Sequence, residues 1–116
     1  MPIMADPSKY YVFVGQGIMF LMHYTYVLLC TDLNRNRSKY YIGSTKNLKQ
    51  RILDHKSKSN KTTKCFDIID LIYYEACLNK TDARKREFQL KTGFGRGYIK
   101  RRNENYFIEN AAVVQR

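Results

Sequence analysis

The sequence is poor in the residues that build cross-linked or metal-rich proteins. It has three cysteines, an odd number without CxxC spacing, and only two histidines. A disulfide framework and a structural zinc site are therefore not indicated, and a histidine-rich metal site is excluded. Free thiols suit a reducing compartment, so we expect the chain to be cytoplasmic.

Long apolar runs are also missing. The most apolar stretch, from Tyr10 to Met22, has 13 residues, whereas a membrane-spanning helix needs about 20. We therefore expect no membrane span. The stretch lacks a strong basic segment before it and a small-residue cleavage site, which argues against a secretory signal. An interaction protein that docks on a membrane surface through this stretch is an alternative.

Negative charge is scarce as well. The chain has 21 Lys and Arg residues against 10 Asp and Glu, a net charge of +11. Lys9 and Asp6 cancel within the first 22 residues, so the whole excess lies on the other 94 of the 116 residues. Ten Tyr and six Phe are interleaved with this charge, which favours a folded nucleic-acid binder over a disordered basic arm. Anionic lipids or no polyanion at all remain alternatives.

Three stretches have the composition of β-strands. Residues 23–30 (HYTYVLLC) and 39–43 (KYYIG) are rich in aromatic and β-branched side chains, and the polar segment between them predicts a hairpin with a long connection. Residues 68–77 (IIDLIYYEAC) form a longer apolar run. We expect this third strand to be the most buried one and to lie at the centre of the sheet.

Helix signals follow the second and third strands. The first helix can be capped by Ser44 or Thr45 and the second by Asn79 or Thr81. Gly93 is a stop signal, and a last, basic helix follows it. The predicted helices cover residues 46–58, about 80–92 and 94–102.

The order of elements, β-β-α-β-α-α, indicates one α/β (α+β) domain with a three-stranded, mainly antiparallel sheet flanked by helices. We expect this domain to cover residues 23–102. Residues 1–22 would be an N-terminal extension of unknown role, either an appended segment or an extra strand or partner-binding arm. Residues 103–116 have little periodicity and are expected to form a C-terminal tail.

An acidic residue falls on the apolar side of the second helix. Helix geometry puts Glu87 about 40° from Ala83 and about 60° from Leu90 around the axis. A buried carboxylate without a partner is costly, so Glu87 must meet a cation, either a metal ion or a basic side chain. The structural alternative is an ordinary salt bridge, within the helix or to another element.

Four further side chains can gather over the sheet. Arg51 and His55 are one turn apart on the first helix, and both can lean toward the strands that carry Tyr26 and Tyr41. Taken singly, an Arg at this position is more often a surface charge and a strand Tyr more often core. Together they supply what phosphodiester hydrolysis needs, a cation for the phosphate oxygens and a base for water.

Residues 23 to about 102 resemble the GIY-YIG nuclease family. The tripeptide YTY at 24–26 stands where the family carries its first motif, and YIG at 41–43 is a literal match. The stretch STKNLKQRILDH is similar to the family's Gly-x-x-x-x-Leu-x-x-Arg segment with its following His, and ARKREFQLK carries the metal-binding Glu. Thr25 puts a hydroxyl where an aliphatic side chain is usual, which we expect to concern packing. The chain is most similar to the small standalone single-domain branch, the Uri-type proteins.

The resemblance implies a metal-dependent DNA endonuclease. It makes Glu87 the ligand of one divalent cation, Mg²⁺ or Mn²⁺, and Arg51 the group that stabilises the pentavalent phosphate. Tyr26 would accept the proton of the attacking water or hold that water, Tyr41 would hydrogen-bond nearby, and His55 would assist orientation or proton transfer. A free tyrosine has a pKa of about 10, so Tyr26 can be a base near neutral pH only if Arg51 and the metal favour its phenolate.

The expected partner is DNA, whether single-stranded, branched or duplex, with RNA also open and the oligomeric state undetermined. Since no separate reading domain is present, cleavage should be structure-selective or weakly sequence-selective, as in DNA repair or recombination. A non-catalytic DNA- or RNA-binding module that retains the fold is the alternative function. The residues expected to contact nucleic acid are Gly43, Lys46, Lys49, Lys56, Lys91, Arg96, Lys100, Arg101 and Arg102.

Overall fold

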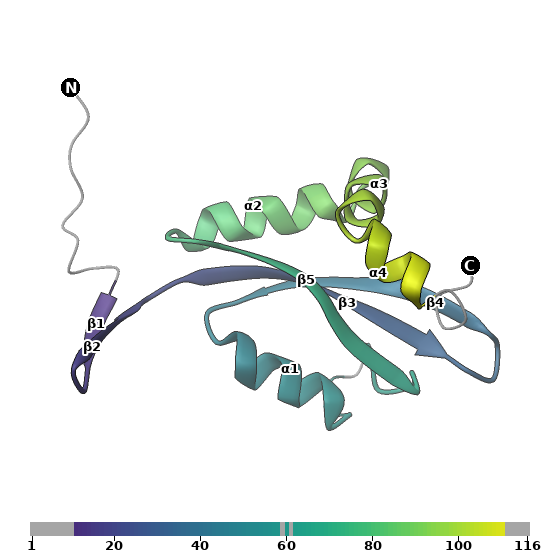
Figure 1. Ribbon diagram of the computed structural model, residues 1–116, viewed down its shortest axis with the longest axis horizontal. Coiled ribbons are helices and arrows are strands. Elements are labelled where there is room, and N and C mark those ends of the chain that lie inside the picture. Colours follow the sequence, from purple (N-terminus) through teal and green to yellow (C-terminus); the bar gives the residue numbers. More distant parts are fainter. Residues whose placement is uncertain (1–10, 59, 61, 111–116) are drawn as a thin grey trace.

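The computed structural model describes residues 11–58, 60 and 62–110. It confirms a three-stranded antiparallel sheet with helices on both faces (Figure 1). The predicted N-terminal extension and C-terminal tail lie partly outside the described residues. In chain order the elements of the sheet and its helices are β3 (His23–Asp32), β4 (Arg37–Thr45), α1 (Leu48–Lys56), β5 (Ile68–Cys77), α2 (Lys80–Leu90), α3 (Gly93–Arg102) and α4 (Glu104–Glu109).

The central strand is β3, so the prediction that residues 68–77 form the centre of the sheet is wrong. The strand order is β4-β3-β5, and β3 pairs antiparallel with both neighbours. Every residue of β3 from Thr25 to Thr31 is buried, whereas only Ile69 of β5 is. Both strands are apolar in sequence, and composition does not say which of them has a partner on each side.

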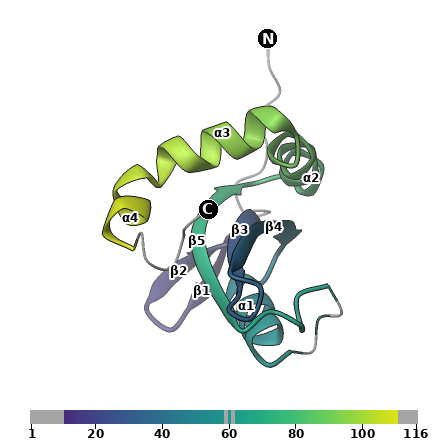
Figure 2. The same cartoon turned by 90° about the vertical axis from the view of Figure 1, so that its right-hand side faces the viewer.

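The side chains of β3 alternate between two cores. Tyr26, Leu28 and Cys30 face α1, where Leu48 and Ile52 cover them. The opposite face of the sheet packs against α2 and α3, and Figures 1 and 2 show these helices and α1 on opposite sides of the sheet. The buried residues of this second core are Val27, Ile42, Leu90 and Ile99.

The helix caps agree with the sequence in one case and differ in the other. Asn79 caps α2 by accepting hydrogen bonds from the backbone N–H groups of Thr81 and Asp82, as predicted. The cap of α1 is Asn47, not Ser44 or Thr45. Those two residues belong to β4, because β4 stays paired with β3 as far as Thr45.

Thr25 has the packing role expected of it. Its side chain is buried, and its hydroxyl donates a hydrogen bond of 2.8 Å to the backbone oxygen of Ala83 on α2. A buried hydroxyl needs such a partner. Thr25 therefore ties the central strand to the helix that carries Glu87.

A separate hairpin precedes the sheet. It consists of β1 (Tyr11–Val14) and β2 (Gly17–Phe20), joined by a turn in which Gly15 has φ +58° (Figure 1). The N-terminal segment thus contains two strands that pair with each other and not with the main sheet, and its role stays a prediction. At the other end, α4 is a short helix inside the predicted tail. Among the described residues, no helix is both long enough and apolar enough to cross a bilayer.

Deletion of residues 1–21 should leave a folded chain with unchanged function. The two strands of the hairpin pair with each other in a sheet of their own, and the β4-β3-β5 sheet is complete without them. The measurements are the midpoint of thermal unfolding and the rate of DNA cleavage, and we expect both to match the full chain. A large fall in both would show that the hairpin stabilises the core.

Candidate active site

The four side chains predicted to gather over the sheet meet between β3, β4 and α1. Arg51 Nε donates a hydrogen bond of 3.2 Å to the hydroxyl of Tyr26, and this hydroxyl lies 3.0 Å from His55 Nε2. The rings of Tyr41 and His55 meet edge to face with centroids 4.8 Å apart. We call Tyr26, Tyr41, Arg51 and His55 the tyrosine cluster.

Local geometry explains why these residues meet. Arg51 and His55 are four positions apart in α1 and so share one side of the helix. Tyr26 and Tyr41 lie on neighbouring strands and both point to the α1 face of the sheet. Opposite Tyr26 in the ladder stands Gly43, which leaves space for the phenol ring.

Gly43 is buried beneath Tyr26, and its expected contact with nucleic acid stays a prediction. A Cβ atom at this position would stand 2.7 Å from Tyr26 Oη and 2.8 Å from Tyr26 Cζ. These distances are too short for van der Waals contact, so a side chain at position 43 must displace the phenol. The glycine is needed for space.

Gly43→Ala should therefore impair cleavage by moving the Tyr26 hydroxyl away from its partners. We expect the single-turnover rate to fall by at least about tenfold, since a displacement of about 1 Å can cost about 10², while affinity for DNA stays within about twofold. The check is a pair of measurements, single-turnover cleavage and fluorescence anisotropy with labelled DNA. A rate equal to that of the wild type would show that the position of Tyr26 does not matter.

Thr63 completes the cluster and was missed from the sequence. It lies in the loop after α1, is fully buried, and its hydroxyl is 2.9 Å from His55 Nδ1. Both ring nitrogens of His55 are thus engaged. A threonine in a polar, basic linker carries no periodic signal, so only the path of the loop could reveal it.

The protonation of His55 follows from its surroundings. Burial lowers the pKa of its imidazole below the usual 6.5, and the positive charge of Arg51 lowers it further. A neutral imidazole has one acceptor and one donor nitrogen. With Arg51 donating to Tyr26, the consistent arrangement has the Tyr26 hydroxyl donating to Nε2 and Nδ1–H donating to Thr63.

Tyr26 is a neutral phenol in the free protein. It is completely buried, and this burial raises its pKa to about 12, although the hydrogen bond from Arg51 acts in the opposite direction. The positive charge of Arg51 thus does not suffice to favour the phenolate. At neutral pH, Tyr26 can pass a proton on to His55 but does not begin as a base.

Glu87 lies on the other face of the sheet, at the side of β4. Its carboxylate accepts a hydrogen bond of 2.8 Å from the Ser44 hydroxyl at Oε1 and one of 2.7 Å from Lys91 Nζ at Oε2. Arg84 Nε is 4.0 Å from Oε1. The required cationic partner of Glu87 is thus Lys91, within the same helical segment. Among the described residues, no hydrogen bond or ion pair joins Glu87 to the tyrosine cluster, although its negative charge adds to the burial that raises the pKa of Tyr26.

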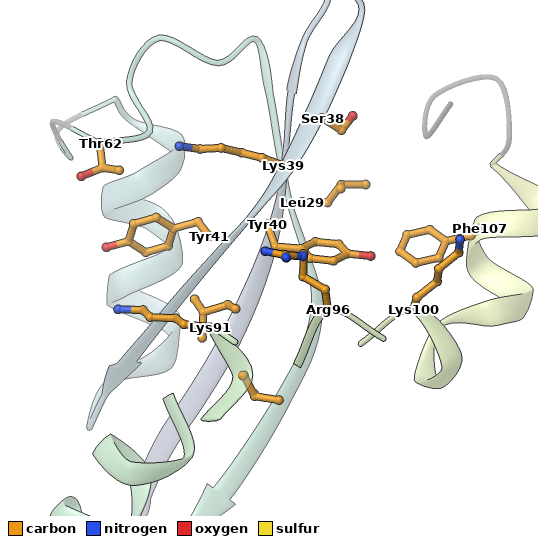
Figure 3. A pocket seen from close by; sticks show the side chains of 12 residues that line it. Leu29, Ser38, Lys39, Tyr40, Tyr41, Thr62, Lys91, Arg96, Lys100 and Phe107 are labelled. Atoms are coloured by element: carbon orange, nitrogen blue, oxygen red, sulfur yellow. The ribbon is translucent and has the colours of Figure 1, made fainter. Parts of the chain in front are cut away.

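A basic groove lies beside both parts of the site. It has a volume of about 860 Å³ and runs along β4, the outer strand, with Tyr41 of the tyrosine cluster and Lys91, the partner of Glu87, in its wall (Figure 3). Its wall carries cations on both faces of the sheet and no acidic side chain. The cations are Lys39, Lys91, Arg96 and Lys100.

The groove contains part of the predicted nucleic-acid surface. Three of its four cations were predicted from the sequence, and Lys39 was not. The remaining predicted contacts are exposed but do not line the groove, and they lie before or on α1 and at the end of α3. They are Lys46, Lys49, Lys56, Arg101 and Arg102.

The oxygen donors around Glu87 fit a hard divalent cation. Glu87 supplies a carboxylate, and the Ser44 hydroxyl lies beside it. Within residues 11–58, 60 and 62–110, no group of three or more His, Cys, Asp or Glu side chains is placed to hold a metal ion. Mg²⁺ commonly binds proteins through one or two carboxylates and completes its shell with waters and substrate phosphates, so a single Glu is compatible with it.

The model of the GIY-YIG catalytic domain matches residues 22–109. The chain belongs to the GIY-YIG family. This is a nuclease family, and its fold implies a nucleic-acid partner. The match runs through α4, beyond the predicted end of the domain at residue 102.

Relatives of this GIY-YIG chain confirm its place in the small standalone branch. A UPF0213 protein of Staphylococcus epidermidis is 32% identical over 71 residues, which cover 60% of this chain and 80% of the relative. A UPF0213 protein of Clostridium perfringens is 35% identical over 71 residues, which cover 60% of this chain and 71% of the relative. No solved structure matches the chain significantly.

Proposed function

We propose that this GIY-YIG chain is a metal-dependent endonuclease that hydrolyses phosphodiester bonds in DNA. The observation that carries the proposal is the hydrogen-bonded series Arg51, Tyr26 and His55. It places a guanidinium, a phenol and a neutral imidazole in contact beside a basic groove. These are the groups needed to hold a phosphate and to take a proton from water.

The proton of the attacking water passes through Tyr26 to His55. A hydroxyl has one donor and two acceptor positions. The Tyr26 hydroxyl donates its hydrogen to His55 Nε2, and one of its lone pairs accepts from Arg51 Nε. The remaining lone pair can accept the water's proton while the Tyr26 proton moves to His55 Nε2. The resulting hydroxide attacks phosphorus, and the leaving oxygen departs with the bonding electron pair and takes a proton from solvent. His55 is left as an imidazolium that donates to Thr63 and then releases its extra proton to solvent.

Arg51 stabilises the charge that develops on the phosphate. Its Nε–H is used by Tyr26, which fixes the plane of the guanidinium and leaves the terminal N–H groups for phosphate oxygens. The hydrogen bond with Tyr26 is the main factor that raises the pKa of Arg51, so its charge is permanent. A planar, charged donor that can bridge two oxygens is suited to a pentavalent transition state.

Glu87 is the proposed ligand of one Mg²⁺ or Mn²⁺ ion, with the Ser44 hydroxyl beside it. Such an ion, when bound, supplies positive charge to the phosphate and the leaving oxygen. Glu87 and Ser44 would hold it at the side of β4, next to Lys91 of the groove wall. In this proposal the tyrosine cluster, on the α1 face of the sheet, accepts the proton of the attacking water.

The proposed substrates are DNA strands that the basic groove can hold by their phosphates, with selectivity for structure more than for sequence. A role in DNA repair or recombination would follow from that selectivity. The alternative function is a binding module without catalysis. The Glu87–Lys91 ion pair favours this alternative, because it neutralises the only carboxylate proposed to bind the cation.

A cleavage assay decides between the two functions. Labelled duplex, single-stranded, flap and junction oligonucleotides are incubated with Mg²⁺, with Mn²⁺ or with EDTA, and the products are separated by electrophoresis. We expect cleavage of at least one substrate that depends on the metal and is lost in Glu87→Gln. Binding to all four substrates without any cleavage would establish the non-catalytic module.

The pH dependence of cleavage should report His55. The neutral imidazole is the proton acceptor, so the rate should rise with pH through the lowered pKa of His55, below 6.5, and then level off. Single-turnover rates between about pH 4.5 and about pH 9 measure this, and His55→Gln should remove the rising part. A rate that still climbs at the alkaline end would indicate that the Tyr26 phenolate is the base.

Folding must be followed in the same pH series. Because burial lowers the pKa of His55, the unfolded chain binds this proton more readily than the folded one. The contribution of His55 to the free energy of unfolding is therefore fully present above about pH 6.5. It is lost on acidification through the lowered pKa. Circular dichroism at each pH separates lost activity from lost structure.

A further inference from the structure

Lys91 belongs to two sites at once. Its ammonium group donates to Glu87 Oε2 at 2.7 Å, and its side chain lines the basic groove along β4 (Figure 3). Ser44 occupies the other oxygen of the same carboxylate. In the free protein, Glu87 therefore has no oxygen without a hydrogen-bond partner to offer a cation.

We propose that the groove binds a phosphodiester backbone and that Lys91 couples this binding to the loading of a divalent cation on Glu87. A phosphate in the groove draws Lys91 away from the carboxylate and opens Oε2. The inference rests on the proposed function, because it takes Glu87 as the cation ligand and a nucleic acid as the substrate.

Exposure makes the Lys91 contact exchangeable. The side chain of Lys91 is 48% exposed, whereas that of Glu87 is only 14% exposed. A lysine in contact with solvent moves to a new anion at little cost, because it is a compact charge on a flexible stem. The phosphates of a bound strand would attract it together with Lys39, Arg96 and Lys100.

Because Glu87 is mostly buried, its carboxylate favours binding of another cation once Lys91 has left. Once Lys91 has left, Oε2 keeps a negative charge in a mostly buried position, and Arg84 lies 4.0 Å from the other oxygen, Oε1. With only Arg84, at 4.0 Å, left to compensate it, such a buried charge is costly. Binding of a divalent cation and of the backbone should therefore each strengthen the other, as linkage requires.

The first test measures cation affinity without nucleic acid. Mn²⁺ is titrated into the full chain, and free Mn²⁺ is followed by electron paramagnetic resonance. Lys91→Gln should bind Mn²⁺ about five- to tenfold more tightly than the wild type, because its competitor is gone. Lys85→Gln, which removes an exposed charge from the same helix, should change the affinity less than about twofold. Equal affinities in the two variants would overturn the proposal.

The second test measures the coupling. The titration is repeated with a short DNA duplex whose phosphorothioate linkages resist hydrolysis, and Mn²⁺ bound by the DNA alone is subtracted. DNA should raise the Mn²⁺ affinity of the wild type and of Lys91→Arg, which keeps the charge, by about fivefold or more. The gain in Lys91→Gln should be below about twofold. The same gain in all three proteins would show that Lys91 does not transmit the coupling.

Glu87→Gln distinguishes failure of the coupling from failure of the proposed function. If Glu87 is the ligand, this variant loses Mn²⁺ binding with and without DNA. Mn²⁺ binding at the wild-type affinity in Glu87→Gln would overturn both the metal site and the inference built on it. Glu87-dependent binding that does not respond to Lys91 would overturn the inference alone.

Discussion

Glu87→Gln should abolish cleavage and leave DNA binding at low salt nearly intact. The substitution keeps the size of the side chain and an oxygen that can accept from Ser44, so the packing of α2 on β4 is retained. It removes the negative charge on which cation binding depends. Lys91 loses its ion-pair partner but remains in the groove wall, so the affinity for the phosphate backbone should be equal to or slightly above that of the wild type.

The measurements are single-turnover cleavage at saturating protein and fluorescence anisotropy at low salt. Glu104→Gln is a matched control, because Glu104 is an exposed acid on α4 and its neutralisation makes the same change in net charge. We expect Glu104→Gln to cleave at the wild-type rate. Full activity in Glu87→Gln would refute the nuclease mechanism in this form.

Tyr26→Phe should lower the single-turnover rate by about 10² to 10⁴, the range for loss of a general acid–base group, with DNA affinity almost unchanged. The hydroxyl is the hydrogen-bonded link between Arg51 and His55, because it contacts both side chains. Its removal also leaves a buried imidazole nitrogen without a partner, which costs about 1–3 kcal/mol. The midpoint of thermal unfolding should therefore fall as well.

Tyr24→Phe is the matched control for this variant. Tyr24 lies on the same strand, two positions before Tyr26, and contacts the ring of Tyr74 outside the tyrosine cluster. Its hydroxyl can be removed without touching Arg51 or His55. If Tyr26→Phe cleaved as fast as Tyr24→Phe with the same pH profile, Tyr26 would be a packed strand residue and another group would take the proton.

Much of the fold could be predicted from local patterns. The aromatic and β-branched composition of residues 23–30 and the helical spacing of Leu48, Ile52 and His55 are properties of the chain itself, and the structure has a strand and a helix there. The third strand, Ile68–Cys77, has the predicted bounds. Its place at the edge of the sheet could not be predicted from local patterns, because the order of strands in a sheet depends on contacts between residues far apart in the sequence.

The candidate site likewise has residues that local patterns predicted and residues that they did not. The spacing of YIG, Arg51 and His55 places these residues on elements that face each other, so their meeting follows from helix and strand geometry. The partner of His55 on its other nitrogen is Thr63, from an irregular loop. Lys39 joins the groove because β4 is an outer strand. Neither position has a sequence signal, since loop paths and sheet edges depend on distant residues.

The sequence by itself determined the family, the three strands of the sheet with helices α1, α2 and α3, and the residue types available for chemistry. Only the tertiary structure decided their electrostatic state. The pKa of Tyr26 rises to about 12 because packing removes water from its hydroxyl, and the Glu87 side chain is only 14% exposed because α2 packs beside β4, where the Ser44 hydroxyl donates to it. The physical reason is that desolvation and contacts between separate elements depend on distances in space, which the order of residues along the chain does not specify.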